Sequence, residues 1–194
     1  MCSIVIALSL LLGGCSRNIK SDAFHQLQVG SPLSELKKKD FAIKEFVDVR
    51  GMPPQRVGRG QGGFNEMTID QPVATVITSA IKKEFERNGH NTLLYSPESK
   101  SDFIIEGTVY RFLLINKFGV FGPVEYVCNV AVKFTVIPTF DANKMFVRKY
   151  EGEYSLFSSW VVSNATFTEM FDQALLAMIK NMSTDQELFN YLNN

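Results

Sequence analysis

Three long runs rich in β-branched and aromatic residues, residues 102–116, 124–138 and 144–157, constrain most strongly what this 194-residue chain can fold into. Side chains of these types fit the pleated, half-buried surface of a sheet. The connections between the runs are short, and they favour antiparallel neighbours because a parallel pair needs a crossover of about a dozen residues or more. Pro138 closes the second run, and residues 141–143 supply turn-forming side chains. The sequence therefore predicts an antiparallel three-stranded meander.

Two segments with helical periodicity accompany the predicted meander. The first begins after Asp70, its expected N-cap, and ends before Gly89, with one apolar stripe along its length. The second opens with a capping-box spacing at residues 166–169 and carries a broad apolar face. Strands over residues 41–48 and 92–95 complete the pattern. We expect an α+β fold: a mixed, mostly antiparallel sheet of about five strands in the order β-α-β-β-β-β-α, with two main helices packed on one face.

The apolar run at residues 4–12, followed by Gly13, Gly14 and Cys15, predicts how the chain is processed. The run is shorter than the roughly 20 residues that cross a bilayer as a helix, and it has the length of a signal-peptide core. A pair of small residues directly before a cysteine is the pattern of the bacterial lipobox. We therefore predict that residues 1–14 form a lipoprotein signal peptide and that Cys15 is lipidated and becomes the first residue of the mature chain.

The alternative is that residues 4–12 form a buried element of the fold and that Cys15 is an ordinary thiol. No turn or polar face links this run to the residues after it, which favours the leader. Residues 1–3 carry no Lys or Arg, although the start of a secretory signal is normally positive. This departure leads us to consider a natural start upstream of residue 1.

Charge and cysteine content limit which partners and which disulfide bonds are possible, and the lipobox sets the expected domain organisation. We expect residues 15–40 to form the lipidated cysteine and a flexible tether, and residues 41–194 to form a single periplasmic domain. Lys plus Arg balance Asp plus Glu at 20 each, so no basic excess indicates nucleic acid, and membrane contact would run through the N-terminal lipid. With Cys2 lost and Cys15 lipidated, Cys128 has no disulfide partner and is expected as a small core residue.

Charged residues show no arrangement typical of catalysis. The sequence contains no motif that pairs a nucleophile with a base and no metal-ligand spacing, so we expect neither enzyme activity nor a cofactor or metal. Asp48 and Arg50 lie two residues apart on a predicted strand, so they point to the same face and could pair. We expect either a structural ion pair or solvated charges at the end of the strand. Glu106 and Glu125 would approach each other across the meander only in one register, which the sequence does not set.

Two connections carry the candidate contacts with a partner. Residues 52–68 are rich in glycine but lack the spacing of a phosphate-binding loop and its closing Lys, so we expect a mobile loop that a partner or a neighbouring subunit orders. Residues 117–123 place two phenylalanines and a valine where a hairpin tip should be polar. These side chains either curl back onto the domain or form an exposed contact. The predicted contact residues are Arg59, Phe64, Phe118, Val120 and Phe121.

Three segments carry a resemblance to a known family. They are Phe46-Val47-Asp48-Val49-Arg50 followed by Val57-Gly58, then Phe85-Glu86-Arg87-Asn88-Gly89, and Ser101-Asp102-Phe103-Ile104-Ile105-Glu106-Gly107-Thr108-Val109. Over residues 41–194 the sequence resembles the YajG-like family of bacterial outer-membrane lipoproteins, whose biochemical function is poorly defined. It is also similar to the periplasmic α/β domain of secretion lipoproteins such as the curli exporter CsgG, which assemble into rings. Similarity to lipoprotein sorting signals, with Ser16 rather than Asp after the cysteine, implies attachment to the outer membrane, facing the periplasm.

These expectations support two hypotheses of function. In the leading one, the protein is a lipid-anchored, non-enzymatic scaffold or accessory subunit that binds an envelope protein or associates with itself as an oligomer. In the second, it is an accessory or carrier lipoprotein in lipid, lipopolysaccharide or secretion-system transport, with an apolar groove between sheet and helices. An envelope hydrolase is the least favoured hypothesis because catalytic motifs are absent from the sequence.

Overall fold

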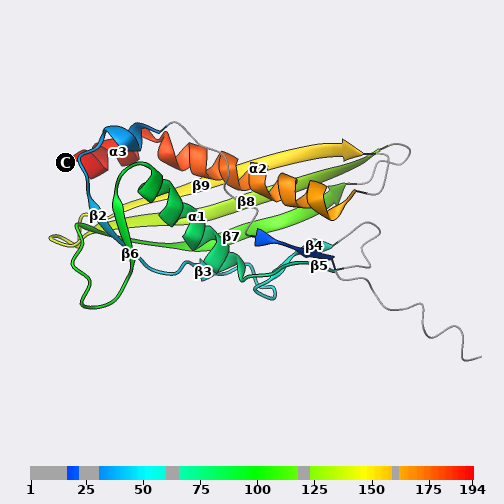
Figure 1. Cartoon of the computed structure of the whole chain (residues 1–194), viewed down its shortest axis with the longest axis horizontal. Helices are drawn as coiled ribbons and strands as arrows, with labels where there is room; N and C mark the ends of the chain where they lie inside the picture. The colour runs from blue at the N-terminus through cyan, green and yellow to red at the C-terminus, as the bar shows by residue number, and fades with distance from the viewer. Residues whose placement is uncertain (1–16, 22–30, 60–65, 118–122, 159–161) are drawn as a thin grey trace, which may run out of the picture.

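A three-stranded antiparallel meander forms the long axis of the molecule (Figure 1). The computed structural model describes residues 17–21, 31–59, 66–117, 123–158 and 162–194. The three strands are β7 (Phe103–Lys117), β8 (Val124–Pro138) and β9 (Phe146–Ser158). In the register of β7 and β8, Phe103 faces Pro138 at one end and Lys117 faces Glu125 at the other. The predicted meander is confirmed, and Pro138 ends β8 as expected.

Six short strands extend the sheet from the other edge of β7. They are β1 (Arg17–Ile19), β2 (Asp40–Ile43), β3 (Val47–Asp48), β4 (Arg56–Arg59), β5 (Glu66–Ile69) and β6 (Asn91–Leu94). Strands β2, β3 and β4 pair in parallel with β7, one after another along its length. Strand β6 flanks β2, whereas β5 and then β1 flank β4.

The result is a nine-stranded mixed sheet, so the expectation of about five mostly antiparallel strands is wrong on both points. Among the described strands, five pairings are parallel and three are antiparallel. The strand expected over residues 41–48 is split into β2 and β3. The strands missing from the prediction, β1, β4 and β5, are only three or four residues long, too short for a period of two to show in the sequence.

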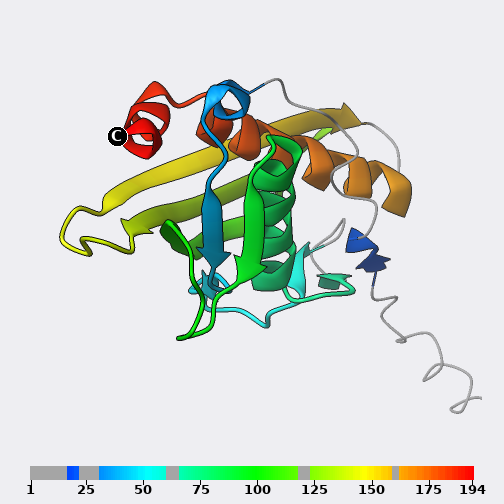
Figure 2. The ribbon, with the colours of Figure 1, turned by 60° about the vertical axis from the view of Figure 1, so that its left-hand side comes forward.

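Two long helices cover one face of the sheet, as predicted (Figure 1 and Figure 2). They are α1 (Val73–Arg87) and α2 (Asn164–Ser183). Phe85 of α1 stacks on Phe134 of β8 with 6.5 Å between ring centroids, and Phe171 of α2 stacks on Phe112 of β7 at 5.0 Å. Phe112 faces Val130 across the β7–β8 pair, and Val130 and Phe134 share a face because side chains alternate along a strand. Both helices therefore bury the same side of the meander.

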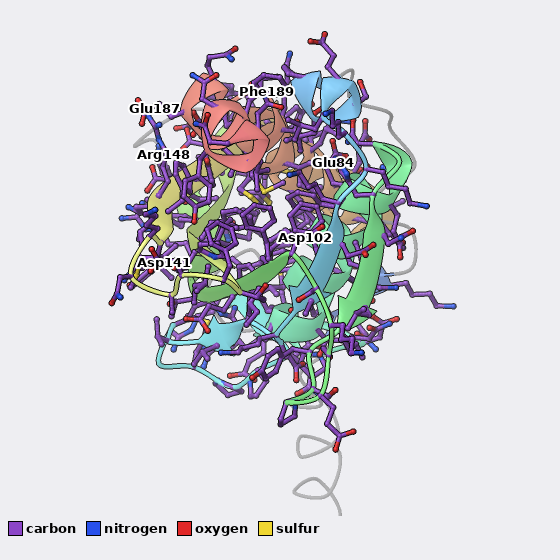
Figure 3. The ribbon with its side chains drawn as sticks, turned by 90° about the vertical axis from the view of Figure 1, so that its left-hand side faces the viewer. Glu84, Asp102, Asp141, Arg148, Glu187 and Phe189 are labelled. Atoms are coloured by element: carbon purple, nitrogen blue, oxygen red, sulfur yellow. The ribbon has the colours of Figure 1, made fainter. Side chains whose placement is uncertain are left out.

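A third, short helix, α3 (Gln186–Asn193), follows the two long ones at the C-terminal end of the domain. It lies at the end of the molecule seen in Figure 3, where Arg148 of β9 reaches Glu187 with Nη1 to Oε2 at 2.8 Å. The Tyr150 hydroxyl donates to Asp185 Oδ2 at 2.6 Å, and the Tyr191 hydroxyl donates to the Val136 carbonyl at 3.2 Å. These polar contacts fix α3 to β8 and β9.

The two long helices begin differently from the expectation. Helix α1 begins after Pro72 without a side-chain cap, because Asp70 instead accepts hydrogen bonds from the backbone and hydroxyl of Ser21 at 2.9 and 2.6 Å. Burial would raise the pKa of Asp70, but the hydrogen bonds from Ser21, together with those from the backbone of Asp70 and Gln71, outweigh it and lower the pKa. Helix α2 begins two residues before the expected capping box, with the Ser163 hydroxyl accepting from the Thr166 N–H at 3.2 Å.

Parts of the expected tether pack on the domain. Strand β1 adds to β5, and Ile19 is buried in the core. A turn of 3-10 helix at Pro32–Glu35 buries Leu33, and the Ser31 hydroxyl donates to the Ser183 carbonyl at 3.0 Å. The structure thus differs from a flexible tether over these two stretches. No helix within the described ranges is long and apolar enough to cross a membrane.

Candidate functional site

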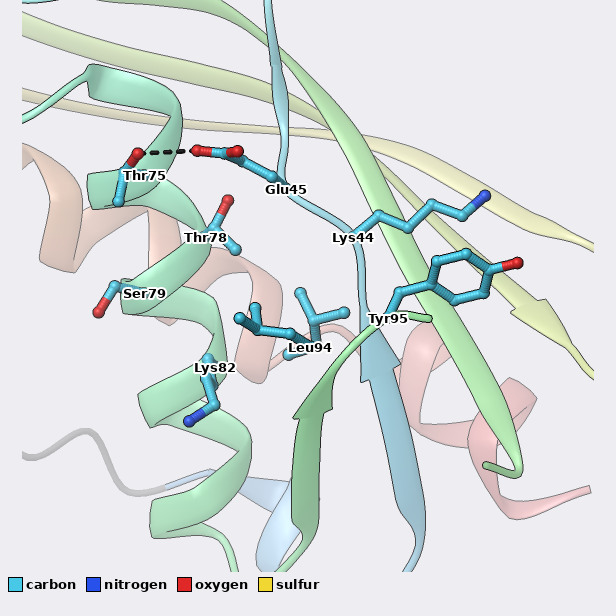
Figure 4. A pocket seen from close by; sticks show the side chains of 9 residues that line it. Lys44, Glu45, Thr75, Thr78, Ser79, Lys82, Leu94 and Tyr95 are labelled. Carbon is cyan, nitrogen blue, oxygen red and sulfur yellow. Dashed lines mark hydrogen bonds between the residues drawn. The ribbon is translucent and has the colours of Figure 1, made fainter. Parts of the chain in front are cut away.

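A groove between α1 and the strands β2 and β6 is the candidate functional site (Figure 4). Its volume is about 570 Å³, and it is open to solvent along one side. Helix α1 lines it with hydroxyl groups and one ammonium group, while the strands and the residues next to them add apolar and charged side chains. The lining residues are Thr75, Thr78, Ser79 and Lys82 from α1, and Ile43, Lys44, Glu45, Leu94 and Tyr95 from the strand side.

Two threonines of α1 position the floor of the groove. The buried Thr78 hydroxyl donates to the Ala74 carbonyl at 2.8 Å and accepts from the Phe46 N–H at 3.0 Å. One turn earlier, the Thr75 hydroxyl donates to Glu45 Oε1 at 2.8 Å. The connection between β2 and β3 is therefore hydrogen-bonded to the helix, which gives this part of the groove a defined shape.

Each cation in the groove has a carboxylate partner. Lys44 Nζ lies 2.7 Å from Glu106 Oε2 and 4.8 Å from the centroid of the Tyr95 ring. Lys82 Nζ lies 3.0 Å from Glu86 Oε1, one turn further along α1. These pairs are partly exposed, so they contribute little to stability, and the charge of each lysine is offset by its carboxylate partner.

The open side of the groove is the edge of the sheet. In the described part of the chain, β6 pairs with β2 alone. The N–H groups of Asn91 and Tyr95 donate to β2 and its flanking residue. Successive residues of a strand direct their backbone groups to opposite sides, so the N–H and C=O groups of Thr92 and Leu94 point away from β2. The Leu94 side chain is 68% exposed beside them. An unpaired edge with an exposed apolar side chain is a template for an added strand.

Asp48 and Arg50 form the predicted ion pair, and the structure gives it a purely architectural role. Arg50 donates from Nε and Nη2 to the two Asp48 oxygens at 2.9 and 2.7 Å. Its remaining donors reach the carbonyls of Pro54, Arg56 and Phe112 at 2.7 to 3.0 Å. Burial would raise the pKa of Asp48, but the hydrogen bonds and charge of Arg50 prevail and lower it. The pair thereby joins the end of β3 to β4 and β7.

The other groups considered for chemistry are separated or buried. Glu106 and Glu125 lie toward opposite ends of the meander, opposite Thr135 and Lys117 respectively, so they do not approach each other. Cys128 is fully buried, and burial raises the pKa of its thiol, in keeping with the predicted core role. Among the residues that the structure describes, no group of three or more His, Cys, Asp or Glu side chains is placed to hold a metal ion.

Of the predicted contact residues, the structure places Arg59. It is exposed at the end of β4, and its carbonyl accepts from Asn116 Nδ2 at 3.1 Å. Phe64, Phe118, Val120 and Phe121 lie outside the described residues, as does the lipidation candidate Cys15. The contact role predicted for these residues stays a prediction.

Sequence reasoning missed the groove itself. Its walls come from α1, from the β2–β3 connection and from β6, which are brought together only by the parallel pairing of β2 with β6 and β7. The one local signal is the pair Leu94 and Tyr95 at the end of a short strand, followed directly by the polar residues 96–102.

Comparison with solved structures shows the same fold in another bacterial protein. The DUF330-family protein XCC0632 from Xanthomonas campestris matches with a TM-score of 0.53 and 14% identity, over 87% of this chain and 89% of that one. The hypothetical protein CT253 from Chlamydia trachomatis gives a TM-score of 0.48 and 9% identity, over 80% and 98%. PelC from Paraburkholderia phytofirmans, a dodecamer, gives 0.42 and 13% identity, over 78% and 96%.

The sequence comparison gives the family. No protein of curated function matches the sequence significantly. Residues 52–193 match the model of a family described as uncharacterized lipoproteins, which covers most of the domain, including the groove helix and the whole meander. The chain therefore belongs to this uncharacterized family of bacterial lipoproteins.

Proposed function

We propose that this protein is a YajG-like lipoprotein of the outer membrane, anchored by lipid on Cys15 and facing the periplasm. In this proposal it serves as a non-enzymatic scaffold or accessory subunit of an envelope assembly. Membership of a lipoprotein family supports the anchor, as does the lipobox sequence that precedes Ser16. The groups most suited to chemistry are Arg50, which is hydrogen-bonded within the fold, and Cys128, which is buried in the core. Their structural roles support a binding function for the protein.

The observation that carries the docking role is the outward-facing edge of β6. The backbone groups of Thr92 and Leu94 lack a strand neighbour on that side within the described chain, and the Leu94 side chain stands exposed beside them. An extended segment of a partner envelope protein would pair with this backbone and bury Leu94. The hydroxyl groups of Thr75 and Ser79 would meet its polar side chains.

A lipid carrier receives less support from the same groove. An acyl chain needs a predominantly apolar lining, whereas Glu45, Lys82 and three hydroxyl-bearing residues of α1 line this groove. The space between helices and sheet is filled by the aromatic core, with Phe41 and Phe85 at 4.5 Å between centroids. Mass spectrometry of lipids extracted from the purified protein separates the two functions, because a carrier retains stoichiometric lipid beyond the anchor.

Photo-crosslinking in intact cells tests the docking role. A photoreactive phenylalanine analogue at Leu94 should yield a discrete adduct with an envelope protein. The matched control is the same analogue at Phe140, which is 75% exposed in the β8–β9 turn, does not line the groove and should yield none. An adduct between two copies of this chain would establish self-association instead. Equal labelling at both positions, or no adduct at Leu94, would contradict a partner site in the groove.

A further inference from the structure

We propose that the domain stands on the membrane by one end of its sheet, here called the proximal end, with the lipid surface itself as the occupant. The proximal end is defined by Arg59, Ile115, Lys117 and Phe157, at the ends of β4, β7 and β9. This orientation rests on the proposed lipidation of Cys15 and adds to it which surface of the domain meets the bilayer.

Strand registers place the start of β1 at the proximal end. Arg17 lies beside Met67 in the parallel pair of β1 and β5. Met67 in turn faces Gly58 of β4, and Gly58 lies beside Leu114, three residues before the end of β7. Since β1 runs away from this end, its first residue, Arg17, stands at the proximal end. In Figure 1, β1, β4 and β5 gather at the same end of the long strands.

The covalent distance from the anchor to β1 is very short. Only Ser16 separates Cys15 from Arg17, and two residue steps span at most about 7 Å. The strand is held in place, because it is paired with β5, Ile19 is buried, and Ser21 donates twice to Asp70. A lipid on Cys15 would therefore leave the folded domain little freedom to move away from the bilayer, and the proximal end must face it.

The side chains of the proximal end suit a lipid interface. Phe157 is 65% exposed and Ile115 is 44% exposed. Phe157 faces Glu125 of β8 and Ile115 faces Val127, so the two apolar side chains share the sheet face opposite the helices. Arg59 and Lys117 add exposed cations at the same end, and Lys117 is paired there with Glu125, its Nζ lying 3.4 Å from Oε2. Apolar side chains enter the boundary of headgroups and acyl chains while the cations reach lipid phosphates.

The same orientation presents the candidate groove away from the membrane. Ile43 in the groove lies beside Ile105 of β7, twelve residues before Lys117. At about 3.3 Å per residue, this is a distance of about 40 Å along the strand. A partner that binds the edge of β6 would thus meet the domain in the periplasm rather than at the lipid surface.

Depth-dependent fluorescence quenching tests the orientation on the full lipidated protein. Single cysteines replace Phe157 or Ile115 at the proximal end and Phe140 or Leu94 at the distal end, each carrying an NBD label. The buried Cys128 of the parent gives the labelling background. The proteins are reconstituted in vesicles of phosphatidylethanolamine and phosphatidylglycerol with doxyl-labelled lipid. Incorporation of labelled palmitate is measured on the same preparations.

Labels at positions 157 and 115 should show blue-shifted emission and several-fold stronger quenching than labels at positions 140 and 94. Palmitate incorporation with equal quenching at both ends, or with stronger quenching at the distal end, would overturn the orientation and leave the proposed anchor standing. Absence of palmitate would overturn the anchor, and the orientation with it. Because the variants at Phe157 and Phe140 each lose an exposed phenylalanine, comparing them controls for the loss of an aromatic side chain.

Discussion

Arg50 and Asp48 are joined through two parallel hydrogen bonds, although the Arg50 side chain is only 1% exposed. Every other guanidinium contact goes to a backbone carbonyl or to the Met52 sulfur. Such a forked pair fixes both the position and the direction of the side chain. The turn between β3 and β4 is therefore built around a buried cation whose only charged partner among these contacts is Asp48.

Replacing Asp48 with Asn should destabilise the protein by about 3 kcal/mol or more, because Arg50 stays buried without its counter-ion. The measurement is the free energy of unfolding from urea titration. The matched control is Glu66→Gln, which removes a carboxylate 3.1 Å from Arg56 on an exposed pair. That change should cost less than about 1 kcal/mol. Similar losses for the two variants would contradict the structural role of the buried pair.

His90 predicts a loss of stability on acidification. Its Nδ1 accepts from the Lys39 N–H at 3.3 Å, and its Nε2 lies 3.0 Å from the Leu33 carbonyl, so a neutral ring with the proton on Nε2 satisfies both. Burial lowers the pKa of His90 and outweighs the hydrogen bond to the Leu33 carbonyl, which raises it, while the charge of Lys39 lowers the pKa further. Below pH about 6.5, His90 therefore binds a proton in the unfolded chain but not in the folded chain. The free energy of unfolding falls as a result.

The variant His90→Gln should flatten this dependence between pH 7 and pH 5, measured as urea midpoints at each pH. Glu84 works in the opposite direction, because burial raises the pKa of its carboxyl and the folded chain takes up a proton first as pH falls. Glu84→Gln should accordingly make the decline steeper. A profile of His90→Gln that runs parallel to the parent would show that this ring does not control the acid response.

Helix α2 approaches β9 closely at Gly152, and this approach depends on the missing side chain. A Cβ at this position would collide with the Ala174 carbonyl and the Met178 backbone, neither of which is the end of a flexible side chain. Gly152→Ala should thus destabilise by about 1–3 kcal/mol or more through overpacking. Ser155→Ala, three residues along the same strand, should change stability by less than about 0.5 kcal/mol. Calorimetric midpoints of the two variants give the comparison, and an unchanged Gly152→Ala would refute the close contact.

Long periodic elements could be predicted from the sequence, whereas non-local ones could not. The patterns in residues 102–157 predict the meander, and the apolar stripes predict α1 and α2. Each of these patterns repeats over many residues, which makes it recognisable. Strand β1 is set by pairing with β5 and strand β4 by pairing with β7, both distant in the sequence, rather than by their own few side chains. The Asp48–Arg50 pair was predictable from a spacing of two, but the carbonyls that complete it depend on the path of the turn and of β7.

The candidate site shows the same division. Cys128 could be assigned to the core because an apolar run surrounds it, and its burial follows directly. The groove depends on a parallel β2–β6 pair between segments about fifty residues apart, and no local pattern encodes that pairing. The contact residues expected from the glycine-rich segment and the hairpin tip rested on composition, and only Arg59 lies within the described residues.

The anchor at Cys15 is tested most directly by metabolic labelling with radioactive palmitate, comparing the parent protein with Cys15→Ser. The parent should incorporate label and fractionate with the outer membrane, while Cys15→Ser should incorporate none and lose its membrane association. Incorporation of palmitate into Cys15→Ser, or identical fractionation of two unlabelled proteins, would contradict a lipid-anchored envelope protein.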